Sequence, residues 1–70
     1  MTLEKLLKLK PDAVIAYVRG VIREKLGDEA ENATVMFAEH GYYFLTIVDS
    51  DTYVLRRKHI PAFLKNLSNL

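Results

Sequence analysis

The run Arg56-Arg57-Lys58-His59 is the densest group of chemically active side chains in the sequence. It leads into Ile60-Pro61, and proline is favoured in the first turn of a helix. Unpaired backbone N–H groups and the positive end of the helix dipole attract anions at such a turn. We therefore expect Arg56, Arg57 and Lys58 either to bind phosphate or to form a solvated strand end that resists aggregation.

Two further arginines, Arg19 and Arg23, lie on the polar side of a predicted helix and would add phosphate contacts. If the strand before the basic run alternates regularly, Arg57 lies beside the rings of Phe37 and Phe44. Cations next to exposed rings are typical of proteins that bind single-stranded nucleic acid. A small nucleic-acid-binding protein is therefore one function that the sequence allows.

Outside these basic residues, the sequence gives little support for a catalytic site or a metal-binding site. The chain has no cysteine, which excludes disulfides, cysteine-based zinc sites and thiol nucleophiles. His40 and His59 lack the spacing of a metal-binding helix, and Asp49 and Asp51 lack the pattern of a calcium loop. The serines have no nucleophile elbow around them. We therefore predict a protein that is not an enzyme and that carries no cofactor and no metal.

Hydrophobic periodicity predicts helices in the first and last parts of the chain. Apolar residues recur at helical spacing in residues 2–9 and 11–26, and again from His59 onward. Residues 28–32 are predicted to form an acidic loop. Gly20 falls inside the second helix, where glycine costs about 1 kcal/mol relative to alanine. We expect this glycine to mark a close crossing over a sheet.

Three predicted β-strands separate these helices. Residues 33–39, 42–48 and 52–57 are rich in β-branched and aromatic side chains. His40-Gly41 and Ser50-Asp51 have the composition of two-residue turns. The predicted fold is therefore α+β, with the order helix, three-stranded antiparallel meander, helix, a short additional helix at the N-terminus, and two layers in one subunit.

Two-residue turns would fix which side chains share a face of the sheet, because successive residues point to opposite sides. One predicted face is mostly aliphatic and is the natural one for helices to cover. Its members are Thr34, Met36, Ala38, Tyr43, Leu45, Ile47, Val54 and Arg56. The other predicted face is also apolar, with Phe37 directly across from Phe44. Its members are Val35, Phe37, Tyr42, Phe44, Thr46, Val48, Tyr53, Leu55 and Arg57.

An apolar second face requires a cover. A sheet that meets water on one side normally alternates apolar and polar residues, and large exposed apolar patches usually mark interfaces. The cover could be a second copy of the chain, the N-terminal helix folded underneath, or an external ligand. We favour the second copy because small chains without disulfides or metals often form twofold dimers. The predicted interface residues are Val35, Phe37, Phe44, Tyr53 and Leu55.

The predicted element order is similar to that of double-stranded RNA-binding domains. In those domains a lysine-rich patch begins the last helix, whereas the basic residues here precede Pro61. The similarity is therefore one of topology, and we infer no membership from it.

Composition places the chain among small globular proteins. It has 70 residues, of which 50% are hydrophobic and 27% charged, and a formal net charge of +1. This is too apolar for a disordered chain, no segment approaches the length of a membrane span, and the first residues lack the form of a signal peptide. We expect one domain over residues 1–70, a cytoplasmic location and no membrane contact.

These observations predict a non-enzymatic interaction module. It would act as a homodimer through its apolar sheet face or through an edge strand, with another protein as a further partner class. The alternative is a nucleic-acid-binding protein that uses Arg56, Arg57 and Lys58 together with Arg19 and Arg23.

Overall fold

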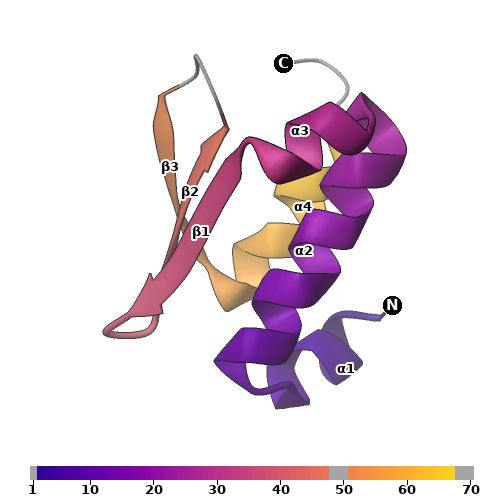
Figure 1. The fold of residues 1–70 in the computed structure, drawn as a ribbon. Helices are drawn as coiled ribbons and strands as arrows, with labels where there is room; N and C mark the ends of the chain where they lie inside the picture. The colour runs from indigo at the N-terminus through magenta and orange to yellow at the C-terminus, as the bar shows by residue number, and fades with distance from the viewer. Residues whose placement is uncertain (1, 48–50, 68–70) are drawn as a thin grey trace.

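The computed structural model describes residues 2–47 and 51–67 and confirms the α+β fold. Three antiparallel strands form a sheet in the order β1-β2-β3, and the helices lie on one side of it (Figure 1). The predicted positions Val48, Asp49 and Ser50 lie outside the described residues. The elements are α1 (Leu3–Lys8), α2 (Pro11–Leu26), α3 (Asp28–Asn32), β1 (Thr34–Glu39), β2 (Tyr42–Ile47), β3 (Thr52–Arg56), the 3₁₀ turn η1 (Arg57–His59) and α4 (Ile60–Lys65).

The hydrophobic core lies between the helix layer and one face of the sheet, which we call the inner face. Val14, Val18 and Ile22 form one fully buried stripe along α2, as expected for an amphipathic helix that packs on a sheet. The sheet contributes alternate residues from each strand. The buried core residues are Leu6, Val14, Val18, Ile22, Met36, Tyr43, Leu45, Ile47, Leu55, Ile60, Leu64 and Leu67.

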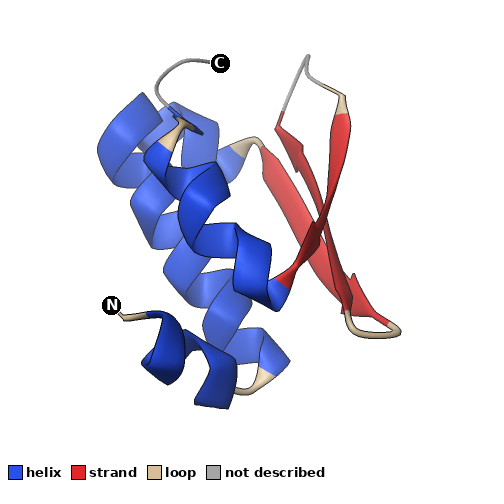
Figure 2. Ribbon diagram, turned by 180° about the vertical axis from the view of Figure 1, so that it is seen from behind, coloured by secondary structure: helices blue, strands red, loops and turns tan. Residues whose placement is uncertain are grey.

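The N-terminal helix α1 belongs to the helix layer and does not cover the opposite face of the sheet (Figure 2). Its buried residue Leu6 is part of the same core as α2 and α4. The backbone oxygen of Leu7 accepts a hydrogen bond of 2.9 Å from Arg57, which holds α1 close to the end of β3. The hypothesis that the opening leucines lie beneath the second face is therefore wrong for the described chain.

The long helix α2 begins and ends where the sequence predicts. Pro11 opens the first turn, and Gly27 ends the helix with a φ of 100°, which disfavours other residue types.

The prediction of an acidic loop after α2 is wrong, since Asp28–Asn32 form the short helix α3. Its acidic side chains lie in the first turn, where they stabilise the helix dipole. The hydroxyl of Thr34 donates to the backbone oxygen of Ala30 and joins α3 to β1.

The first hairpin has the predicted register. Glu39 lies opposite Tyr42, and Phe37 lies opposite Phe44. His40 and Gly41 have φ angles of 51° and 81°, and a type I′ turn requires positive φ at both central residues.

The second hairpin has a different register from the one predicted. A two-residue turn would place Asp49 opposite Thr52, but Thr46 is the residue found there. The shift of three residues is odd, and it therefore moves every side chain of β3 to the other face. Leu55 lies in the core at 9% exposure and Val54 is 57% exposed. The predicted register would have placed the charge of Arg56 under the helices, and burial of Leu55 avoids that cost.

The register correction reverses the predicted faces of four residues of β3, namely Tyr53, Val54, Leu55 and Arg56. Tyr53 lies on the inner face, where its ring packs against Phe63 with centroids 5.1 Å apart. Leu55 also lies on the inner face, opposite Tyr43. Arg56 lies opposite Tyr42 and therefore belongs to the face without helices, which we call the outer face.

Gly20 does not mark a close approach to the sheet, so that prediction is wrong. A Cβ atom built at this position meets no other atom within 4 Å.

We therefore expect Gly20→Ala to raise the free energy of unfolding by about 1 kcal/mol, because alanine favours the helix and nothing opposes its methyl group. Urea unfolding measures this change. Gly27→Ala is the matched control and should lower stability, since the φ of 100° strains any residue with a Cβ. A loss of stability in Gly20→Ala would contradict the placement of α2.

Candidate functional site

The outer face of the sheet is the main exposed apolar surface of the described chain. Val35, Phe37 and Val54 are 60%, 49% and 57% exposed. Phe44 is partly buried, and its ring stacks on that of Phe37 with centroids 5.0 Å apart and planes inclined by 14°. Aromatic pairs of this geometry are favourable beyond the area they bury. The outer face therefore presents an apolar centre, with two stacked rings, to its surroundings.

The outer face is ordered into three rows that run across the strands. In the first row the hydroxyls of its two threonines share a hydrogen bond of 2.8 Å. In the third row an arginine lies over a tyrosine ring, and its Nη2 donates to the phenol oxygen over 2.9 Å. We call the rows the threonine row, the aromatic row and the charged row. They are Val35–Thr46–Thr52, Phe37–Phe44–Val54 and Glu39–Tyr42–Arg56.

The structure brings together three of the five predicted interface residues. Val35, Phe37 and Phe44 lie on the outer face, as the first hairpin predicts. Tyr53 and Leu55 lie on the inner face and contribute to the core instead. The sequence reasoning missed Val54 and Arg56 as outer-face residues because it used the wrong turn length. The signal that could have placed them is the alternation within β3 itself. Either register buries one of the adjacent residues Val54 and Leu55, but the predicted register places Arg56 under the helices, whereas the observed one leaves it exposed.

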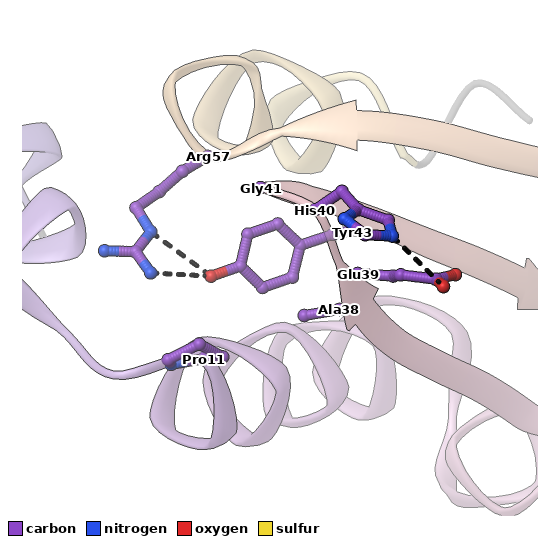
Figure 3. A pocket seen from close by; sticks show the side chains of 7 residues that line it. All are labelled: Pro11, Ala38, Glu39, His40, Gly41, Tyr43 and Arg57. Carbon is purple, nitrogen blue, oxygen red and sulfur yellow. Dashed lines mark hydrogen bonds and ion pairs between the residues drawn. The ribbon is translucent and has the colours of Figure 1, made fainter.

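The prediction that Arg57 lies beside Phe37 and Phe44 is wrong. It belongs to η1, and its guanidinium points toward Tyr43 of the inner face (Figure 3). Its Nε and Nη2 donate to the Tyr43 phenol oxygen over 3.2 and 2.8 Å, and its Nη1 donates to the backbone oxygen of Leu7 over 2.9 Å. Three hydrogen bonds therefore fix the plane of this guanidinium.

Two hollows lie next to the first hairpin turn, and Arg57 lines both of them. One has a volume of about 360 Å³ and lies between Pro11, Glu39, Tyr43 and Arg57 (Figure 3). The second has a volume of about 490 Å³. We call the second one the basic hollow, because four of its lining residues are cationic or imidazole side chains and none is acidic. Its lining is Leu7, His40, Gly41, Tyr42, Arg56, Arg57 and Lys58.

The two predicted phosphate-binding arginines of α2 do not join the basic hollow. Arg57 lies near Pro11, the first residue of α2. Arg23 is twelve residues further along that helix, which places it about 18 Å away at 1.5 Å per residue. Its guanidinium instead forms ion pairs with Asp28 and Glu31 of α3. Arg19 lies on the same helix, and its Nε is buried without a hydrogen-bond partner in the described part of the chain.

Comparison of the chain with protein-family models, with curated proteins and with solved structures found no match. No group of three His, Asp or Glu side chains within residues 2–47 and 51–67 is placed to hold a metal ion. The helices described in the same ranges are too short or too polar to cross a membrane. The candidate sites are therefore the outer face and the basic hollow.

The hydrogen bonds of Tyr43 predict a specific stability effect. Tyr43→Phe removes the acceptor of two Arg57 N–H groups in a partly buried site, and we expect a loss of about 1–2 kcal/mol in the free energy of unfolding. Tyr42→Phe is the matched control, because its phenol accepts from the exposed Arg56, and its effect should stay within about 0.5 kcal/mol. Urea unfolding of dilute samples compares them. Equal effects of the two substitutions would contradict the assigned role of Arg57.

Proposed function

We propose that this protein is an interaction module that associates with a second copy of itself through the outer face. The observation that carries the proposal is the aromatic row, in which Phe37 and Val54 are about half exposed on either side of Phe44. Contiguous apolar surface of this kind is unfavourable in water and usually marks an interface. A second copy would present the same surface, so each aromatic row could cover the other.

The charge pattern of the outer face supports a second copy as the partner. In the charged row, Glu39 and Arg56 stand at opposite edges of the sheet, on either side of Tyr42. A twofold axis parallel to β2 places β1 of one copy against β3 of the other. Glu39 then faces Arg56 of the second copy, and the reverse pair forms at the other edge. The aromatic rows meet in the middle, with Phe44 at the axis.

The other twofold arrangement is less favourable. An axis across the strands would place each charged row against the threonine row of the second copy. The carboxylate of Glu39 and the guanidinium of Arg56 would then be covered by apolar and hydroxyl groups without an opposite charge. Covering unpaired charges is costly. The axis parallel to β2 is therefore the arrangement that we propose, and it agrees with the aligned packing common for two sheets.

The size of the outer face predicts a reversible dimer. Three strands about 4.8 Å apart and six residues long at about 3.4 Å per residue give a flat footprint of roughly 300 Å² per chain. Doubled for two chains this is about 600 Å², before the relief of the side chains is added, which is below the size of standard specific interfaces and in the range of weak, transient ones. We therefore expect association in the micromolar range. Pairing through the edge strands would leave the aromatic row uncovered and is for that reason the weaker arrangement.

The nucleic-acid alternative has narrower support than the sequence indicated. Arg23 is engaged by the carboxylates of α3, and neither it nor Arg19 lines the basic hollow. A continuous basic surface would have been the expected footprint of nucleic-acid binding. The remaining support is the group Arg56, Arg57 and Lys58, which lines one hollow.

Replacing the exposed ring tests the proposed interface without disturbing the core. Phe37→Asp should keep the helical and strand content of the wild type and shift the dimer constant to at least tenfold weaker association, because it places a carboxylate in each aromatic row. Sedimentation velocity over a concentration series measures this. Leu3→Asp, a similar change at a residue 44% exposed on α1, is the control and should leave association unchanged. A wild-type chain that stays monomeric at high micromolar concentration, or a Phe37→Asp variant that associates normally, would refute the interface.

Charge reversal tests the direction of the twofold axis. Glu39→Arg alone and Arg56→Glu alone should each weaken self-association about tenfold, because like charges then face one another. An equal mixture of the two variants should form heterodimers, and the double variant should recover association, since opposite charges face again. Sedimentation velocity measures both the weakening in the single variants and the recovery in the mixture and in the double variant. Failure of the mixture and of the double variant to recover, with an intact wild-type dimer, would reject the axis while leaving the interface in place.

A further inference from the structure

We propose that the basic hollow binds a phosphate group. The hollow lies between the first hairpin turn, the start of η1 and α1, and has a volume of about 490 Å³. Arg56, Arg57, Lys58 and His40 lie in its wall, and none of its lining residues is acidic. A concave surface lined by charges of one sign concentrates the positive potential and raises the local concentration of anions. The charge of the wall therefore selects an anion.

The geometry of Arg57 favours phosphate among anions. Its guanidinium is held by the Tyr43 phenol and the Leu7 backbone oxygen, which use three of its five N–H groups. The remaining two N–H groups lie on a side chain that is already ordered, so little rotamer freedom is lost when they bind a ligand. Guanidinium groups of this kind make strong paired hydrogen bonds with phosphate oxygens. Arg57 thus supplies a fixed point of attachment at one side of the hollow.

Lys58 supplies a mobile charge at the same hollow. It is exposed, and it forms no ion pair with a carboxylate in the described part of the chain. Glu39, the residue before His40, lines the adjoining hollow, and its carboxylate lies 3.6 Å from His40 Nε2. A lysine of this kind can follow a phosphate group as a point charge while Arg57 fixes its orientation.

The inference does not depend on the proposed dimer. Arg57 and Lys58 belong to η1 and not to the outer face of the sheet. Arg56 is the one residue shared by both surfaces, and pairing with Glu39 of a second copy would leave the two η1 cations to bind the ligand. A variant at Lys58 therefore tests the hollow without changing the aromatic row or the charged row.

Titration with two phosphate probes tests the inference and identifies the source of the phosphate. Inorganic pyrophosphate and a short single-stranded DNA oligonucleotide are added separately to the full chain at low salt, and backbone amide signals are followed by NMR. We expect the signals of Gly41, Arg57 and Lys58 to shift with saturation. Lys58→Glu should bind about tenfold more weakly, because one charge-assisted hydrogen bond is lost and a repulsion is gained.

Lys65→Glu is the matched control, since it makes the same charge change at an exposed residue of α4 that does not line the hollow. It should bind both probes within about twofold of the wild type. Tighter binding of pyrophosphate would indicate a small phosphorylated ligand, and tighter binding of the oligonucleotide would indicate a nucleic-acid backbone. The inference is overturned if neither probe shifts these signals, or if Lys58→Glu and Lys65→Glu lose the same affinity. The wild-type sedimentation behaviour is measured separately, so that loss of the dimer and loss of the phosphate site are distinguished.

Discussion

The constraint that governs this structure is that a single layer of helices covers a sheet whose two faces are both apolar. All helices, including α1, lie on the inner face (Figures 1 and 2). Their buried stripes meet alternate residues of the three strands, and little apolar helix surface remains for the other side. The aromatic row is therefore left on the outside. No element within residues 2–47 and 51–67 covers it, and we infer that its cover comes from another molecule.

Polar contacts join the end of the sheet to the helix layer and link two helices within that layer. Arg57 connects the end of the sheet to Tyr43 and to the backbone of α1. Within the helix layer, Lys25 of α2 donates to the backbone oxygen of Leu64 over 2.6 Å and so links α2 to α4. These contacts fix the orientation of the layers more than they add to stability, because each one is at most partly buried.

The sequence was sufficient for the three strands, for the helices α1, α2 and α4, and for the register of the first hairpin. His40-Gly41 has one low-energy solution, since both residues must accept positive φ, and this fixed the register of β1 and β2. The second turn offered no such restriction, because aspartate and serine occur in loops of several lengths. Its register depends on whether Leu55 or Val54 is buried, and that choice is made by packing against the helices. Short acidic segments such as Asp28–Asn32 are likewise ambiguous, because neither helix nor loop propensity dominates over five residues.

The most direct measurement of the central claim is an isotope-filtered NOE experiment on a mixed sample of labelled and unlabelled chains. It detects only contacts between different molecules. If the outer faces pair about an axis parallel to β2, cross-peaks will join the ring of Phe37 to the methyl groups of Val54 in the other copy, and the ring of Phe44 to its own counterpart. A spectrum without contacts between molecules at millimolar concentration, with the rings of Phe37 and Phe44 exposed to water, would contradict the account.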